Sequence, residues 1–211
     1  MTFSIPRNLT TRIHRARFYL DTHEKDEREL VKKHLPPEST VLELGACLGV
    51  VSAVINRCLS NRHAHVAVEA NPQLLPILEE NRQRNDCQFE IASGMVSKTS
   101  DGTFYIDDCI VVSGPVQESE RRIKVPVFSI EDLQTRYGLE FDTLFMDIQG
   151  GELALLEEHV GLLPGFKLII LELHPHLMGD QAAERCRAIL AESRHNCVEK
   201  SGLIEVWQRT D

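Results

Sequence analysis

A short glycine-containing turn is the first part of this sequence whose residue types suggest chemistry. The stretch VLELGACLGV, residues 41–50, is an apolar run that leads into the turn, and Glu43 lies just before it. Gly45 and Gly49 would let the backbone turn tightly and approach a ligand without an intervening side chain. A dinucleotide-binding turn of the form GxGxxG would need glycine where Cys47 stands, so the spacing speaks against a bound pyrophosphate. A carboxylate beside the turn would instead suit a sulfonium or ammonium group, unless the glycines merely end a strand and begin a helix.

Two further acidic residues end strand-like segments downstream. Glu69 closes the apolar segment AHVAVEA (64–70), at about the distance from the turn where an acid hydrogen-bonds ribose hydroxyls in nucleotide-binding βαβ units. Asp147 ends the segment DTLFMDI (142–148) directly before a predicted helix, which makes it a candidate base for a hydroxyl proton. The helix amides and dipole would lower the pKa of Asp147 and make it a weak base. The alternative is that Asp147 only caps the helix through residues 149–151.

The segment LELHPHL ends another strand-like run with two histidines, His174 and His176. A histidine with a near-neutral pKa at a ligand-binding edge could accept a hydroxyl proton, although most histidines near strand ends are packed or solvated. His174 is the stronger candidate, because His176 lies beyond Pro175. Glu172 shares a strand face with His174, and with Asp147 the pair could offer oxygen and nitrogen ligands to a divalent metal. Since the sequence does not fix that geometry, we predict no metal.

Strands and helices that alternate along the chain must position these side chains. This alternation predicts βαβ units and a mostly parallel sheet with right-handed crossovers. The closing segment NCVEKSGLIEVWQ predicts a hairpin about Ser201 and Gly202, which would add an antiparallel strand. We therefore predict one α/β domain with a doubly wound sheet, in which ligands bind at the carboxyl ends of the strands, near the point where strand order reverses. The expected strands are 40–44, 64–70, 87–92, 142–148 and 167–173, and the expected helices are 22–35, 49–59, 72–84, 130–137, 151–163 and 180–193.

Two segments stand apart from this alternation. Residues 1–37 are predicted to form an N-terminal arm, loose over its first 20 residues, and a helix, whereas 38–211 form the main domain. Residues 99–128 interrupt the main domain and are predicted to contain a hairpin with Asp107 and Asp108 at its tip. Either the arm or the insertion could serve as a lid over a bound acceptor, because long irregular segments near a site often do so.

Composition and charge narrow the classes of partner. The chain has 211 residues, of which 42% are hydrophobic and 26% are charged, which is typical of a globular protein. A formal charge of −9 argues against nucleic acid as a partner, and the local cluster of Arg121, Arg122 and Lys124 is typical of a solvated edge. The sequence has neither a signal-peptide apolar region nor a membrane-length apolar run, and its six cysteines form no CxxC pair. We expect a cytoplasmic protein with reduced cysteines and no membrane partner.

Three motifs together resemble those of class I S-adenosylmethionine (SAM)-dependent methyltransferases. They are VLELGACLG, VAVEANP and LFMDIQGGELALLE, and their spacing agrees as well as their content. The resemblance is greatest to the FkbM-type family, whose first motif is similar to GAN-x-x-G and whose later motif is similar to K-x-D-x-E-G-x-E. It covers roughly residues 38–175 and implies a Rossmann-like, seven-stranded class I methyltransferase fold with SAM as the cofactor.

The resemblance also implies which residues hold the cofactor. The glycine turn and Glu43 would shape the methionine end of the SAM site, and Glu69 would bind the ribose hydroxyls. The residues after the third strand would lie near the adenine, and Asp147 and Gln149 would close the site at the end of the fourth. Asp147 and His174 are the catalytic candidates. The implied cofactor-binding residues are Glu43, Gly45, Ala46, Gly49, Glu69, Ala70, Asn71, Ser93, Gly94, Asp147 and Gln149.

The activity that the resemblance implies is SAM-dependent O-methylation of a sugar or another small hydroxylated metabolite. Cys47 stands where the family usually has asparagine, Phe145 where it has lysine, and Gln149 where it has glutamate. Gln149 keeps its hydrogen-bonding capacity but lacks the charge. These departures motivate a second hypothesis, a degenerate relative that binds the cofactor or a partner without turnover. An NAD-type oxidoreductase would need glycine at Cys47, and a nucleic-acid methyltransferase conflicts with the acidity of the chain.

Overall fold

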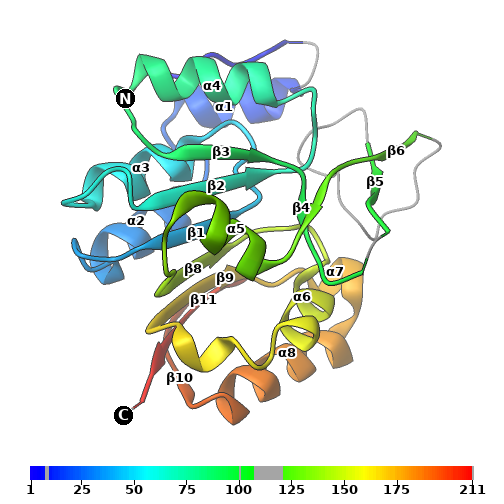
Figure 1. The fold of residues 1–211 in the computed structure, drawn as a ribbon. Helices are drawn as coiled ribbons and strands as arrows, with labels where there is room; N and C mark the ends of the chain where they lie inside the picture. The colour runs from blue at the N-terminus through cyan, green and yellow to red at the C-terminus, as the bar shows by residue number, and fades with distance from the viewer. Residues whose placement is uncertain (8–9, 100, 107–120, 211) are drawn as a thin grey trace.

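A seven-stranded sheet forms the centre of the structure, a computed structural model that describes residues 1–7, 10–99, 101–106 and 121–210 (Figure 1). Its strands are β1 (Val41–Leu44), β2 (His65–Glu69), β3 (Glu90–Ser93), β8 (Thr143–Met146), β9 (Leu168–Glu172), β10 (His195–Ser201) and β11 (Ile204–Arg209). They lie in the order β10-β11-β9-β8-β1-β2-β3. The first five are parallel to their neighbours among themselves, whereas β11 is antiparallel to both β9 and β10. The α/β fold with a doubly wound, mostly parallel sheet and an antiparallel closing hairpin is therefore confirmed.

The strand order reverses between β1 and β8. The chain builds the sheet from β1 through β2 to β3, and then returns to the other side of β1 with β8 and β9. Connections from adjacent strands leave in opposite directions at such a point, which opens a crevice at the carboxyl ends of the strands. The glycine turn after β1 and the loop after β8 both lie at this crevice.

The central strands form because their residues are apolar on both faces. All four residues of β1 and all four of β8 are buried. Strands that are covered by helices on both faces read as continuous apolar runs rather than alternating ones. The exception in β1 is Glu43, whose carboxylate is 1% exposed and must therefore find partners inside the protein.

Helices cover both faces of the sheet (Figure 1). The helices are α1 (Arg12–Tyr19), α2 (Lys25–His34), α3 (Val50–Cys58), α4 (Leu75–Arg84), α5 (Ile130–Tyr137), α6 (Glu152–Glu158), α7 (Pro175–Met178) and α8 (Asp180–Glu192). The apolar residues of α2, α3 and α4 pack on one face, and those of α5, α6 and α8 pack on the other. The carboxyl ends of β1, β2 and β8 are bordered by loops, by α6 and by the N-terminal segment.

The N-terminal arm is more ordered than its sequence predicts. We expected its first 20 residues to be loose, but α1 forms within them, and the Thr11 side chain caps it by accepting from the His14 amide. Two asparagines of α4 anchor the arm, because Asn81 and Asn85 exchange hydrogen bonds with the backbone of Ser4 and Thr2. The hydrogen bonds to Asn81 and Asn85 join residues about 80 positions apart, so the weak apolar pattern of this segment does not reveal them.

Two boundaries after β8 also differ from expectation. α6 ends at Glu158 rather than at 163, and a separate 3₁₀ turn (Leu163–Gly165) follows it. Gly161 and Pro164 disfavour a continued helix. The short α7, which begins at Pro175, was not predicted.

Two small ribbons form in and beside the insertion. β5 (Thr103–Tyr105) pairs antiparallel with β6 (Arg122–Lys124), and β4 (Met95–Val96) pairs parallel with β7 (Val127–Phe128). The predicted tip at Asp107 and Asp108 lies outside the described residues. The β5–β6 ribbon projects beyond the sheet (Figure 1).

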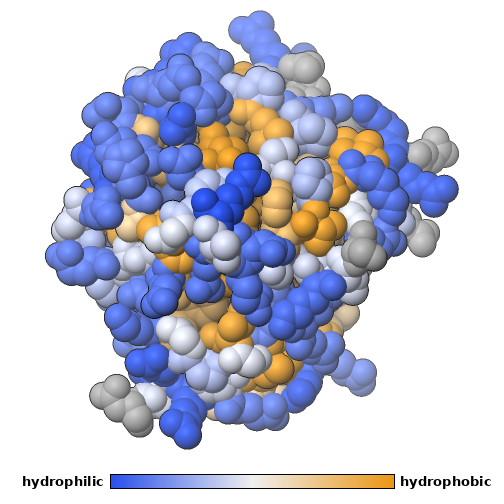
Figure 2. Space-filling view, viewed as in Figure 1, coloured by the Kyte–Doolittle hydropathy of each residue, from blue (hydrophilic) through white to orange (hydrophobic). Residues whose placement is uncertain are grey.

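Hydrophilic side chains cover most of the face drawn in Figure 2, and hydrophobic ones reach its surface between them in separate patches. Across the described ranges, no helix combines the length and apolar composition that crossing a bilayer requires. The cysteines in those ranges are all free thiols.

Candidate active site

A cavity of about 310 Å³ lies at the carboxyl ends of β1, β2 and β8. Its walls come from the glycine turn, the residues after β2, the residues after β3, the insertion, the loop after β8 with α6, and the N-terminal segment. Of the predicted site residues, those that line the cavity are Gly45, Glu69, Ala70, Asn71, Gly94, Asp147 and Gln149.

The glycine turn comes into direct contact with the loop after β8. Gly45 has a φ of +89°, and a Cβ atom built on it would lie 1.8 Å from the carbonyl oxygen of Asp147. Only glycine fits both this backbone conformation and this spacing. Gly45 thus brings the two walls of the crevice together at the point where strand order reverses.

Gly49 is needed for packing rather than for the cavity wall. It caps α3 with a φ of +79°, and a Cβ atom there would lie 2.7 Å from Leu78 Cδ1 of α4. Ala46 is buried against Leu78 as well, and neither residue lines the cavity. Both support the turn from behind.

Glu69 is the acidic group at the β2 side of the cavity. Its carboxylate accepts hydrogen bonds from the amides of Cys47 (2.8 Å) and Asn71 (2.6 Å). Burial raises the pKa of Glu69 to about 7, although these two amides oppose the shift. Each carboxylate oxygen keeps acceptor capacity for a further donor. The neighbouring Asn71 Nδ2 is buried and has no hydrogen-bond partner among the described residues, although Asn71 lines the cavity.

Glu43 does not lie where the sequence predicted it. We expected it to shape the cofactor end of the site, but its carboxylate accepts from Ser52 Oγ (2.9 Å) and contacts His65 Nε2 (3.0 Å), away from the cavity. Side chains alternate between the two faces of a strand, and Glu43 points toward α3 while Leu44 reaches the cavity. Ser93 also does not line it; its side chain is exposed at the end of β3.

Asp147 faces the cavity and does not cap α6. That helix has no side-chain cap, and the Gly150 amide donates to Glu152 Oε1 (3.1 Å). Asp147 Oδ1 instead accepts from Gln149 Nε2 (3.0 Å). Burial raises the pKa of Asp147 to about 6; His174 opposes the shift and Glu24 adds to it. The expectation of a lowered pKa is therefore wrong, because removal from water outweighs the helix dipole at this position.

His174 lies behind Asp147 and is 3% exposed. Its Nδ1 is 2.8 Å from Oε1 of the fully buried Glu152, and its Nε2 is 3.0 Å from Gln149 Nε2. In the neutral imidazole, Nδ1–H donates to Glu152 and Nε2 is left as the acceptor. Burial alone would lower the pKa of His174, but the surrounding carboxylates, Glu152 first, raise it.

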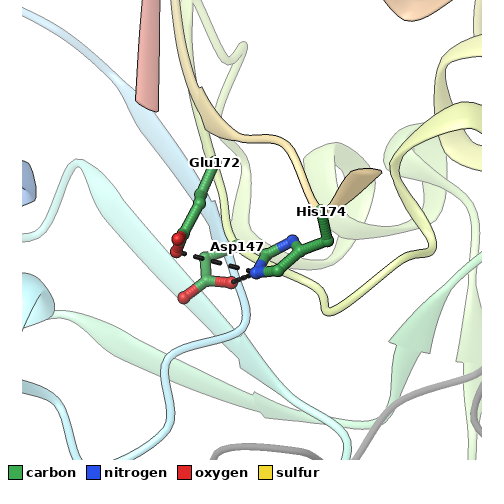
Figure 3. A group of neighbouring side chains, drawn as sticks. All are labelled: Asp147, Glu172 and His174. Atoms are coloured by element: carbon green, nitrogen blue, oxygen red, sulfur yellow. Dashed lines mark ion pairs between the residues drawn. The ribbon is translucent and has the colours of Figure 1, made fainter. Parts of the chain in front are cut away.

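Glu172 completes a cluster with these two residues (Figure 3). His174 Nε2 lies 3.5 Å from Asp147 Oδ1 and 3.7 Å from Glu172 Oε2. Burial raises the pKa of Glu172 to about 8, and the nearby charge of Asp147 adds to the shift. We did not predict a metal site, yet one ligand atom from each of the three residues lies within 4.8 Å of the other two.

Several wall residues were not singled out by the sequence. His14 and Phe18 of α1, and His23 and Glu24 after it, line the cavity from the N-terminal segment. The rings of Phe18 and His23 stack with centroids 4.0 Å apart. Glu24 adopts the left-handed conformation (φ 48°), which a glutamate seldom does and no sequence pattern announced. Phe104 of the insertion also lines the cavity, so both candidate lids contribute to its walls.

Comparison with solved structures shows the same fold at low sequence identity. A precorrin-6y C5,15-methyltransferase from Geobacter metallireducens matches with a TM-score of 0.56 and 16% identity, over 98% of this chain and 95% of that one. The O-methyltransferase TomG from Streptomyces achromogenes, solved with SAM, matches with a TM-score of 0.54 and 13% identity, over 100% and 93%. An O-methyltransferase from Bacillus cereus, solved with S-adenosylhomocysteine (SAH), matches with a TM-score of 0.53 and 16% identity, over 97% and 84%.

Sequence comparison identifies the family. Among curated proteins, none matches this chain. The family model of the methyltransferase FkbM domain matches residues 43–197, which include the glycine turn, Glu69 and the cluster of Asp147, Glu172 and His174. The chain therefore belongs to the FkbM methyltransferase family.

Proposed function

We propose that this chain transfers a methyl group from SAM to a hydroxyl group of a sugar or another small hydroxylated metabolite. The observation that carries the proposal is one cavity with two different acidic ends, Glu69 at β2 and Asp147 at β8. The first end suits the cofactor and the second suits an acceptor hydroxyl.

The residues at the β2 end fit the cofactor. Glu69 is held by two backbone amides and keeps acceptor capacity for the two ribose hydroxyls. The unpartnered Nδ2 of Asn71 offers a donor beside it. The close approach at Gly45 leaves room for the methionine portion along the bare backbone of the turn.

The acidic charge of the cavity walls also fits SAM. Four carboxylates line the cavity, those of Glu24, Glu69, Asp147 and Glu158, and the described lining residues include neither lysine nor arginine. When bound, SAM supplies an electrophilic methyl group on a positively charged sulfur. Acidic walls attract that charge and would repel the phosphates of a nucleic acid. The modest volume of the cavity favours a small acceptor over a polymer.

Asp147 is the group that we assign to the acceptor. Its carboxylate faces the cavity and would accept the hydroxyl proton as the oxygen bonds to the methyl carbon and the carbon–sulfur bond breaks to release SAH. His174 is a positioning residue, because it contacts Asp147 and Gln149 from behind and does not line the cavity. Apolar wall residues such as Phe18 and Phe104 exclude water from the reacting groups.

Calorimetric titration with SAH tests the cofactor half of the proposal. We expect 1:1 binding, weakened about 100-fold in Glu69→Ala, since two hydrogen bonds to a charged group are lost. Glu157→Gln, which changes an exposed carboxylate on α6, serves as the matched control and should bind SAH normally. No SAH binding by the unaltered chain would overturn the proposal. Incubation with methyl-labelled SAM and a panel of sugars then tests the acceptor.

One observation favours a second function, cofactor binding without turnover. The Gln149 amide donates to Asp147 and contacts His174 Nε2, so it satisfies the two groups that would otherwise meet an acceptor. This alternative predicts normal SAH binding but no labelled product with any acceptor.

A further inference from the structure

Three potential ligand atoms converge beside the cavity. Asp147 follows β8, Glu172 ends β9, and His174 lies two residues beyond it. The parallel pairing of β8 with β9 places Met146 opposite Leu171, so the residues that follow each of them lie side by side. In Figure 3 the two carboxylates and the His174 imidazole point toward one another.

The spacing of these atoms is that of ligands around one ion. His174 Nε2 lies 3.5 Å from Asp147 Oδ1 and 3.7 Å from Glu172 Oε2. Two ligands each about 2.1 Å from a common ion lie about 3.0 Å apart at a right angle and about 3.6 Å apart at 120°. The two carboxylate oxygens lie within 4.8 Å of each other, so small rotations of the side chains would bring all three ligand atoms into contact with one ion.

A buried carboxylate orients the histidine for this task. Glu152 accepts from Nδ1 of His174, which leaves the Nε2 lone pair directed at the two carboxylates. Histidines that bind metals commonly donate their other nitrogen to a carboxylate in this way. Glu152 is 0% exposed, and its Oε2 has no hydrogen-bond partner in the described part of the chain. A third negative group is thus committed to the cluster.

Apart from His174, no cationic side chain among the described residues pairs with the two carboxylates of Asp147 and Glu172. The Gln149 amide lies among these groups, and its Nε2 is 3.0 Å from both Asp147 Oδ1 and His174 Nε2. An N–H dipole in that position partly substitutes for a cation.

We propose that Asp147, Glu172 and His174 bind a divalent cation of the first transition row, with Gln149 rotating its amide to present oxygen. One imidazole nitrogen with carboxylate oxygens suits such an ion better than Ca²⁺, which prefers oxygen alone. Positions of the ion that face the cavity would bind the acceptor hydroxyl and lower its pKa. Asp147 would then bind the ion through Oδ1, and its second carboxylate oxygen would accept the proton that the hydroxyl loses. This inference rests on the proposed function for its role, but not for the binding itself.

Titration of the EDTA-treated full-length chain with Mn²⁺, followed by electron paramagnetic resonance, tests the site without any turnover. We expect one Mn²⁺ per chain, with binding weakened at least 100-fold in Glu172→Gln and about 10- to 100-fold in Glu152→Gln, which removes only the partner of His174. The control Glu157→Gln should bind Mn²⁺ like the unaltered chain.

A gain-of-affinity variant guards against misfolding as an explanation. Gln149→Glu places a carboxylate where the amide now lies and should tighten Mn²⁺ binding about tenfold. Equal Mn²⁺ affinity in the unaltered chain and Glu172→Gln, or no gain in Gln149→Glu, would overturn the site. SAH titration in EDTA separates the two proposals: SAH binding without Mn²⁺ binding removes only the metal, whereas Mn²⁺ binding without SAH binding removes only the proposed function.

Discussion

The two acidic ends of the cavity are neutralised in different ways. Backbone amides of Cys47 and Asn71 hold Glu69. At the other end, Asp147 and Glu172 meet only His174 and the Gln149 amide within the described residues. Backbone donors are fixed by the fold, so the Glu69 end is preformed, whereas side-chain donors can turn away. Under the proposed function, the Glu69 end would bind the constant ligand, SAM, and the Asp147 end would change partners during the reaction cycle.

Asp147→Asn should have the largest effect on methyl transfer, because it alters only the Asp147 end of the cavity. The substitution removes the charge that faces the acceptor but keeps the size of the side chain. We expect methyl transfer to fall about 10²- to 10⁴-fold, while SAH affinity changes about threefold or less, because the Glu69 end is intact. Single-turnover rates with labelled SAM, together with SAH titration, measure both. A parallel loss of SAH affinity would show that the two ends are not separate.

Gly45→Ala should disturb both ends at once, because Gly45 joins their walls. The new Cβ would meet the Asp147 carbonyl oxygen at 1.8 Å, so the two loops must separate. We expect a loss of about 3 kcal/mol or more in the free energy of unfolding and a clear loss of SAH binding. Urea unfolding measures the first of these effects.

Gly138→Ala is the matched control for that variant. Gly138 also has a positive φ, +65°, but a Cβ there would meet nothing within 4 Å. Its cost should therefore be only the backbone conformation, about 1 kcal/mol, with SAH binding unchanged. Equal losses in the two variants would mean that the close approach at Gly45 is unimportant.

SAH affinity should depend on pH through Glu69. Its pKa is raised to about 7 by burial, with Glu43 adding to the shift and the amides of Asn71 and Cys47 opposing it. Ribose hydroxyls donate best to the ionised carboxylate, so affinity should fall as pH drops below 7, by up to about tenfold per unit. Calorimetry across this range should give a flatter profile for Glu69→Gln; an unchanged profile would rule out Glu69 as the titrating group.

The stability of the ligand-free chain should respond in the opposite direction. A carboxyl group whose folded pKa lies above its unfolded value of 4.5 binds its proton more tightly in the folded state. Its contribution to the free energy of unfolding is complete below pH 4.5 and is lost as pH rises through about 7. Urea unfolding of the unaltered chain and Glu69→Gln at pH 5 and pH 8 should show this difference.

Glu43→Gln should have the smallest effect on stability and SAH binding, and it compares Glu43 with Glu69 of the neighbouring strand. Glu43 and Glu69 lie on adjacent strands, yet Glu43 is committed to Ser52 and His65. We expect a loss of about 1 kcal/mol in the free energy of unfolding and no change in SAH affinity. A marked drop in SAH affinity would return Glu43 to the cofactor site.

The sequence predicted the sheet well because its central strands are short, mostly apolar runs bounded by turn residues. β1, β8 and β9 are such runs, and four or five residues are too few for a typical helix. The turn at Gly202 likewise predicted the closing hairpin. Helix α1, whose apolar pattern is weak, was not predicted, and the end of α6 was placed too late although Gly161 and Pro164 signal it.

Only part of the candidate site could be predicted from the sequence, because the direction of each side chain depends on the tertiary structure. Glu69 and Asp147 end their strands, so strand ends alone place them at the crevice. The role of Glu43 depends on which face it points to and on Ser52 of α3, which is a tertiary fact. The left-handed backbone of Cys47, Glu24 and Gln149 also lies beyond a reading of residue types, since none of them is glycine.

The N-terminal wall of the cavity can open at a rate that differs from the unfolding rate of the sheet. Helix α1 contributes His14 and Phe18 to the cavity but contains no buried residue, whereas every residue of β1 is buried. Local opening costs least where little apolar surface is covered, so α1 can detach while the sheet stays folded. Small molecules would then enter and leave the cavity at the rate at which α1 detaches, which is far faster than global unfolding. Backbone amides of α1 would accordingly exchange with solvent long before those of β1.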